Sequence, residues 1–189
     1  MKIQIDNIPE EGILLWSKEA ADAYPVLADM VRAGECRFEA PIHVSLRAKP
    51  VREMIEAEGR LETTVRLPCR RCIEPFDKPL KRQFRLYFTQ ELPEFDGDDD
   101  EDGAELSADD IGLTLFKGDA IDFTDALQEQ VVLALPDWAL CGEDCRGLCP
   151  KCGANLNVGT CGCDTEVADD RFAVLKNLKI VPGAEPPGK

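Results

Sequence analysis

Six cysteines fall within the 23 residues from Cys141 to Cys163, and this cluster constrains the fold more than any other feature of the chain. The same segment has five glycines but few apolar residues, so it cannot be stabilised mainly by burying apolar surface. Its Cys149-Pro-Lys-Cys152-Gly motif has the form of a zinc knuckle, in which two thiolates two residues apart fold around one ion. The cysteines therefore predict a bound metal, and the chemistry of all-thiolate sites favours zinc.

The number of cysteines fits two metal sites. A closed structural zinc site takes four protein ligands, and eight of the nine cysteines make two full sets, with Cys36 left over as a small, partly buried residue. The preferred pairing places the last four cysteines together in the knuckle and joins the Cys-x-x-Cys pair of the first half to the first two cysteines of the tail. Swapped pairings remain open. The predicted zinc ligands are thus Cys69, Cys72, Cys141 and Cys145 for one ion, and Cys149, Cys152, Cys161 and Cys163 for the other.

Two reactive roles for these cysteines compete with the structural one. The spacing of Cys145, Cys149 and Cys152 is that of a radical-type iron–sulfur site, but such enzymes place a large barrel after the motif, and only 37 residues follow. Cys69-Arg-Arg-Cys72 could form a redox dithiol, because arginines lower a thiol pKa. Redox pairs usually open a helix within a βαβ pattern, whereas this one lies between two expected antiparallel strands. The sequence therefore favours a metal site with no reaction of its own.

Other features also argue against an enzyme. His43 is the single histidine and lies at a polar position of an expected strand, so a catalytic histidine is not indicated. The chain contains no glycine-rich phosphate-binding motif. The first residues show no secretory signal, and no apolar run is long enough to span a membrane. We therefore predict a non-enzymatic protein of the reducing cytoplasm, where clustered cysteines are ligands rather than disulfides.

Alternating apolar and polar residues predict an antiparallel sheet. Residues 42–46 alternate with period two, and so do residues 61–67 and 80–88, which form two strands joined by a loop at 68–79. That loop carries the first Cys-x-x-Cys pair. Further on, residues 121–123 predict a short edge strand, followed by a helix that begins near Asp122 or Thr124 and runs through Leu135.

These elements predict an α+β fold, namely a mainly antiparallel sheet with a few helices and a C-terminal cysteine-rich zinc knuckle. The expected division of the chain has five parts. Residues 1–90 form a β-rich part with the Cys-x-x-Cys hairpin loop, 91–110 an acidic mobile linker, 111–140 a strand and helix packed on the sheet, 141–180 the knuckle and a helix near 170–178, and 181–189 a disordered tail.

Charge is divided unevenly along the chain. The formal net charge is −15, with +1 in residues 1–90 and −16 in residues 91–189, which excludes binding to phosphate through an overall positive field. Residues 66–85 hold the one basic patch, at +5, and residues 91–110 contain eleven acids and no base. Any nucleic-acid contact must therefore be local.

Four ordered motifs resemble one known family. They are residues 67–76 (LPCRRCIEPF), residues 121–136 around Ile121-Asp-Phe-Thr-Asp and Gln130-Val-Val-Leu-Ala-Leu-Pro136, the cysteine segment 141–163, and Arg171-Phe-Ala-Val-Leu-Lys-Asn-Leu178. Together they resemble the YceD family of bacterial proteins, named for their requirement in the accumulation of large-subunit ribosomal RNA. The resemblance covers roughly residues 40–180.

The resemblance implies a non-enzymatic role in ribosome assembly or ribosomal RNA stability, with large-subunit ribosomal RNA or ribosomal proteins as partners. It passes on no catalytic residue. The first of the four motifs lies within the basic patch, where a zinc-held loop would present Arg70 and Arg71 to phosphates. A zinc-stapled adaptor unrelated to ribosomes and, less favoured, a thiol oxidoreductase remain as alternatives. The residues expected to contact RNA are Arg66, Arg70, Arg71, Lys81, Arg82 and Arg85.

Overall fold

The computed structural model describes residues 1–91 and 113–163. It divides into two compact units, residues 1–145 and residues 146–189, and each is described here by itself. Most of the predicted acidic linker, the expected helix near 170–178 and the expected tail lie outside the described residues. The five-part division of the chain therefore stays a prediction.

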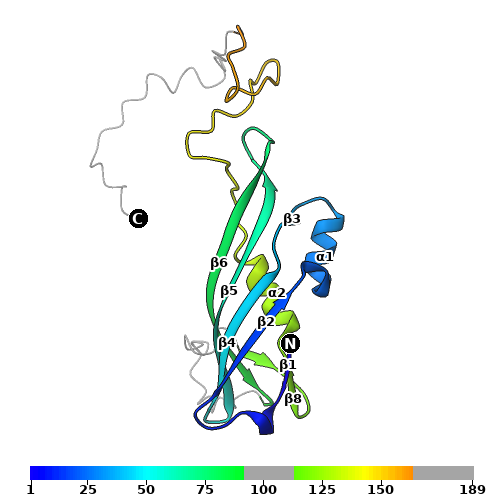
Figure 1. Cartoon of the computed structure of the whole chain (residues 1–189), viewed down its shortest axis with the longest axis vertical. Coiled ribbons are helices and arrows are strands. Elements are labelled where there is room, and N and C mark those ends of the chain that lie inside the picture. Colours follow the sequence, from blue (N-terminus) through cyan, green and yellow to red (C-terminus); the bar gives the residue numbers. More distant parts are fainter. Residues whose placement is uncertain (92–112, 164–189) are drawn as a thin grey trace, which may run out of the picture. The chain divides into compact units, whose positions relative to one another are not determined.

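The first unit is built on a six-stranded sheet with the order β2-β4-β5-β6-β7, in which β3 also pairs with β5 (Figure 1). All pairs are antiparallel except β6 with β7. A small second sheet pairs β1 with β8. The fold is α+β with a mostly antiparallel sheet, as the sequence predicts. The strands are β1 (Lys2–Gln4), β2 (Ile13–Glu19), β3 (Arg37–Phe38), β4 (Ile42–Val51), β5 (Met54–Pro68), β6 (Pro75–Thr89), β7 (Leu113–Leu115) and β8 (Ala120–Asp122).

Two α-helices accompany these strands, α1 (Pro25–Arg32) and α2 (Thr124–Val132), with short 3-10 turns at Ile5–Asn7 and Ala21–Ala23. Leu127 and Val131 of α2 are fully buried in the same cluster as Leu61 of β5. Phe88 of β6 meets Phe123 edge to face, with ring centroids 5.1 Å apart. The core therefore lies on the face of the sheet that α2 covers (Figure 1).

The strand β4 confirms its predicted alternation. Ile42, Val44 and Leu46 are buried, whereas His43 between them is exposed. Because successive side chains of a strand point to opposite faces, the polar residues of β4 and its neighbours form a second, outward-facing surface on the sheet.

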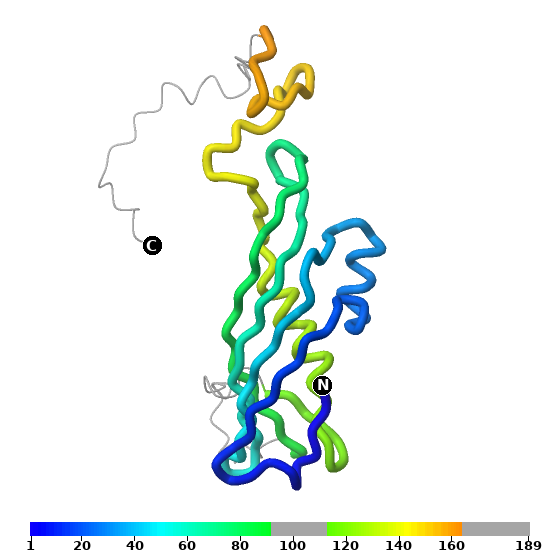
Figure 2. Tube along the Cα trace, viewed as in Figure 1, coloured from blue at the N-terminus to red at the C-terminus, as the bar shows by residue number. Residues whose placement is uncertain are grey.

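The β5–β6 hairpin is longer than the sequence predicts. Its pairing runs to Pro68 and Pro75, so the expected loop at 68–79 shrinks to residues 69–74 (Figure 2). In the sequence, the prolines of this segment indicate a loop, because proline is rare inside central strands. Since β7 pairs only with residues 87–89, the outer edge of β6 is open over most of its length, and prolines are tolerated on such an edge.

The helix α2 begins where predicted but ends earlier. Oδ1 of Asp122 accepts hydrogen bonds from the backbone N–H and the hydroxyl of Thr124, at 3.0 and 2.7 Å. The helix ends at Val132 rather than Leu135, and two i→i−3 turns, to Ala134 and Leu135, carry the chain to Pro136.

We expect Asp122→Ala to lower the free energy of unfolding by about 1 kcal/mol at pH 7, the usual value of such a helix-start contact. Burial raises the pKa of Asp122, but the two Thr124 hydrogen bonds and Lys2 lower it to about 2. A carboxylate with a lowered pKa stabilises the fold above its unfolded pKa, about 3.9, and loses that effect as the pH falls through 2. Urea denaturation of the wild type and of Asp122→Ala at several pH values measures this difference in stability. Identical urea midpoints for the two proteins at pH 7 would contradict the prediction.

Candidate metal centres

The first cysteine cluster joins two distant segments of the first unit. Cys69 and Cys72 lie in the loop between β5 and β6, and Cys141 and Cys145 follow α2. All four sulfur atoms lie within 4.8 Å of one another. The Cys69–Cys145 and Cys72–Cys141 sulfur pairs are each 3.7 Å apart. This grouping is the one that the sequence favours.

Backbone hydrogen bonds bring the two segments together. The N–H of Arg70 donates to the carbonyl of Ala139 at 2.8 Å, and the N–H of Cys141 points at the sulfur of Cys69 at 3.4 Å. Cys69 is only 2% exposed. The loop is therefore tied to the segment after α2 by its own backbone as well as by its sulfur atoms.

The second cluster lies within the second unit and contains Cys149, Cys152, Cys161 and Cys163, again with all sulfur atoms within 4.8 Å. Little apolar surface is buried around it: Val158 is 86% exposed. The local fold is held by a few polar contacts, such as the Asn157 side-chain carbonyl, which accepts from the N–H of Arg146 at 2.7 Å.

The two Cys-x-x-Cys loops share one backbone geometry. The N–H of Cys69 donates to Glu74 O and that of Ile73 to Cys69 O; in the second loop Cys149 donates to Ala154 O and Gly153 to Cys149 O. The residue directly after the second cysteine of each motif has a left-handed backbone conformation, with φ of 65° at Ile73 and 73° at Gly153. A β-branched residue rarely adopts this conformation. Aligning the two motifs in the sequence would have revealed that Ile73 occupies the glycine position.

The spacing of the sulfur atoms fits a tetrahedral metal site. With metal–sulfur distances of about 2.3 Å, the edges of such a tetrahedron are roughly 3.8 Å long. The two 3.7 Å sulfur pairs match that edge, and a disulfide would need about 2.05 Å. All nine cysteines are free thiols. Both clusters are therefore compatible with metal binding.

The pKa values in each cluster diverge. Burial raises the pKa of Cys69, but backbone N–H groups pointing at its sulfur lower it to about 6. Side-chain hydrogen bonds with Cys145 and Cys69 raise the pKa of Cys141 to about 12. Cys149 and Cys163 repeat this contrast, at about 6 and about 12. One thiolate is thus favoured in each cluster, and a divalent cation would favour the thiolate form of the others.

The predicted RNA-binding residues do not form one surface. Since β5 and β6 pair Arg66 with Asp77 and Leu61 with Arg82, Arg66 lies on the outer face of the hairpin and Arg82 on the core face. Arg82 donates to the side-chain carbonyl of Gln130 on α2 at 2.8 Å.

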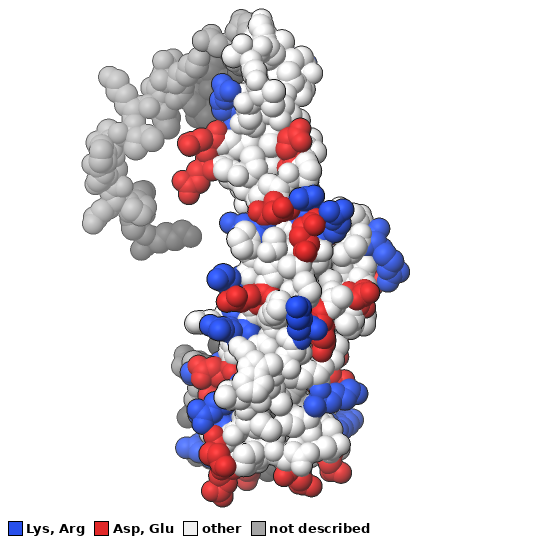
Figure 3. All heavy atoms as spheres, viewed as in Figure 1, with Lys and Arg blue, Asp and Glu red and all other residues white. Residues whose placement is uncertain are grey.

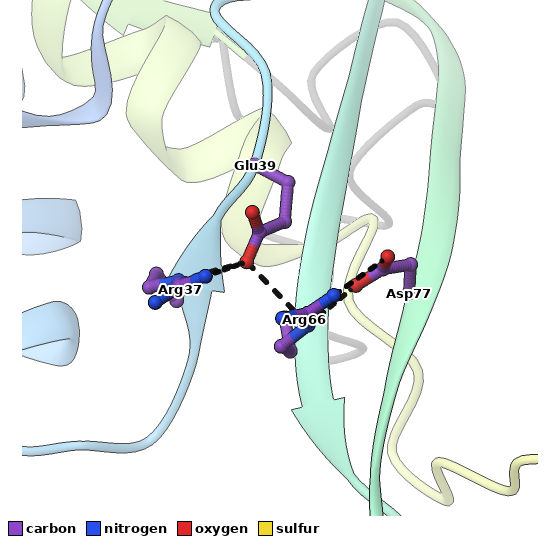
Figure 4. Close-up of polar contacts among 4 residues, drawn as sticks. All are labelled: Arg37, Glu39, Arg66 and Asp77. Atoms are coloured by element: carbon purple, nitrogen blue, oxygen red, sulfur yellow. Dashed lines mark hydrogen bonds and ion pairs between the residues drawn. The ribbon is translucent and has the colours of Figure 1, made fainter.

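Most of these cations are already engaged. Arg66 donates to both carboxylate oxygens of Asp77, at 2.7 and 2.9 Å, and lies 3.5 Å from Glu39, which also accepts from Arg37 (Figure 4). Arg71 donates to the carbonyls of Glu143 and Cys145. Acidic and basic side chains are interspersed on the face that Figure 3 shows.

The other three predicted RNA-binding residues differ in whether their side chains have a partner. Lys81 lies 3.7 Å from Glu62, and Arg85 pairs with Glu56 and Glu58. Only the Arg70 side chain, within this predicted set, lacks a partner among the described residues. The sequence shows the basic patch but not the acids that face it.

The fold and the two clusters define a small α+β protein with two candidate four-cysteine metal centres. Residues 57–179 match the family described as "Large ribosomal RNA subunit accumulation protein YceD". The chain belongs to the YceD family, as its motifs indicate.

Curated relatives agree with this. The chain is 28% identical over 156 residues to the Arabidopsis thaliana "Large ribosomal RNA subunit accumulation protein YCED homolog 1, chloroplastic", covering 74% of this chain and 49% of that protein. The Zea mays protein of the same name is 30% identical over 142 residues, covering 65% and 48%. An uncharacterized protein of Mycobacterium tuberculosis is 29% identical over 139 residues, covering 74% and 62%.

This chain thus spans about half the length of the plant relatives that it matches. No solved structure matches it. Within residues 1–91 and 113–163, no helix is long and apolar enough to cross a membrane.

Proposed function

We propose that this protein supports the accumulation of large-subunit ribosomal RNA without catalysing a reaction, by binding that RNA or a ribosomal protein in the bacterial cytoplasm. The family name and the plant relatives, which carry that name, support the role. Each cluster holds one zinc ion through four thiolates, so both sites are closed to substrate. The proposed ligands are the eight cysteines of the two clusters.

The first cluster carries this proposal. It joins the β5–β6 loop to the segment after α2, two parts of the chain separated by about seventy residues, and both parts lie in the region that matches the family. A metal that crosslinks two such segments fixes the fold. It leaves no ligand position for a reacting group, which agrees with a binding role.

The proposed function is tested by removing the gene and measuring the ratio of large- to small-subunit ribosomal RNA. We expect the ratio to fall and to recover when the wild-type gene or a Lys151→Ser variant, altered between two ligands, is restored. A Cys72→Ser, Cys152→Ser double variant should not restore it. A ratio that stays unchanged when the gene is removed would show that the protein does not serve this role.

A further inference from the structure

Three neighbouring rows of side chains lie on the outer face of the sheet, opposite the core, and together they form one surface. Paired residues of neighbouring antiparallel strands point to the same side, so the strand registers define these rows. The middle row has no acidic residue. From β2 to β6 the rows read Lys18–His43–Glu62–Lys81, Trp16–Ser45–Arg60–Gln83 and Leu14–Arg47–Glu58–Arg85.

An exposed tryptophan begins the middle row. Trp16 is 71% exposed on the edge strand β2, although a large aromatic side chain normally buries most of its surface. Ser45 beside it is small, and hollows on both sides of this row are lined by Ser45 and Arg60. The row therefore offers an open aromatic face, and Gln83 at its far end lies three strand spacings away, roughly 14 Å.

The three rows together carry a net positive charge, and two of their cations have no partner among the residues that the structure describes. Over the three rows, five cations face two acids, on a chain whose net charge is −15. The acids Glu58 and Glu62 already face Arg85 and Lys81. Lys18 and Arg60 make no ion pair or hydrogen bond with any residue in the described part of the chain.

We propose that this face binds single-stranded RNA, with a base stacked on Trp16 and with Arg60 and Lys18 contacting phosphates. Unpaired bases stack on exposed aromatic side chains of open sheets, and phosphates are neutralised by cations that the protein itself leaves unpaired. A duplex fits less well, because its bases are already stacked on one another. The inference rests on the proposed function and names the surface through which it acts.

Charge complementarity selects RNA over a second copy of the chain. Two copies joined through this face would bring two sets of five cations and two acids together, and such net positive surfaces repel. Phosphates instead meet the positive face directly, while the net negative charge of the rest of the chain limits non-specific wrapping. The contact is therefore small and local.

Fluorescence of Trp16 tests the proposal. The chain has two tryptophans, so a Trp138→Phe background leaves Trp16 as the only one. We expect a single-stranded decauridylate or decaadenylate to quench its emission, with an affinity that falls as salt rises. Binding measured in parallel by anisotropy of labelled RNA should weaken about 10-fold or more in Trp16→Ala and in Arg60→Glu.

Matched variants serve as controls. Trp138→Ala removes the other exposed tryptophan, and Lys78→Glu reverses a charge on the opposite side of the hairpin, since Lys78 pairs with the buried Val65. Both should bind RNA as the wild type does. Equal losses in test and control variants would overturn the assignment to this face.

The other outcomes separate the surface from the function. If RNA binds but Trp16→Ala and Arg60→Glu leave the affinity unchanged, this face is not the site, while the proposed function stands. If the wild-type protein binds no RNA, the proposal fails. If, in addition, neither Trp16→Ala nor Arg60→Glu restores ribosomal RNA in cells lacking the gene, the face serves a protein partner instead. A concentration-dependent dimer that Trp16→Ala dissociates would assign it to a second copy.

Discussion

Cys72→Ser should reduce the bound zinc from two ions per chain to one and should lower the free energy of unfolding of the first unit by on the order of 4 kcal/mol. The estimate treats the metal as a crosslink between residues 72 and 141, which closes a long loop in the unfolded chain. The buried sulfur of Cys69 would then also lose the cation that balances its charge. Urea denaturation and a colorimetric zinc assay measure the two effects.

Cys36→Ala is the matched control for this variant. Cys36 is buried beside Val65 and Leu80 and belongs to neither cluster. We expect it to keep both ions and to lose much less stability than Cys72→Ser. If Cys72→Ser retained two ions, the first cluster would not be a four-thiolate site, and the crosslink account of the hairpin would fail.

Cys152→Ser should unfold residues 146–163 while leaving the sheet intact. The described part of the second unit has only a few polar contacts, and its exposed Val158 shows how little apolar burial supports it. Small domains of this kind fold only when the metal binds. In a proton–nitrogen correlation spectrum, the signals of this segment should move to random-coil positions, and those of β4 to β6 should not.

Lys151→Ser provides the comparison for the second cluster. Lys151 lies between the proposed ligands Cys149 and Cys152 but contributes no sulfur. Its replacement should leave the spectrum and the metal content unchanged. A Cys152→Ser protein with a dispersed spectrum for residues 146–163 would mean that local hydrogen bonds alone hold this segment.

Parts of the fold with strong local patterns could be predicted from the sequence. Alternation along residues 42–46 and 61–67 reports which side chains are buried, because a strand has a period of two. The grouping of the cysteines is favoured by the sequence, because two Cys-x-x-Cys loops and four further thiols make two sets of four, but swapped groupings stay open until the structure places the sulfur atoms. The count of four ligands per ion thus predicts that the β5–β6 loop lies next to the segment after α2, although the two are far apart in the sequence.

Other features depend on partners that are distant in the sequence. The strand β2 and the helix α1 could not be predicted, because their burial is set by packing on β4 and α2. The sequence shows no partners for the basic patch. In the structure, however, Arg66 donates to Asp77 across the hairpin, and Arg82 donates to Gln130 of α2. The outer face containing Trp16 emerges only when the registers align residues from four strands.

Native mass spectrometry of the full chain is the most direct test of the central claim, that both clusters are closed zinc sites. It distinguishes the metal-free chain, disulfide-bonded forms and chains with one or two ions of a given metal. We expect one dominant species with two zinc ions, which loses them together with its fold when acid protonates the thiolates. A chain purified without zinc but with disulfides between these cysteines, or one carrying an iron–sulfur cluster, would contradict it.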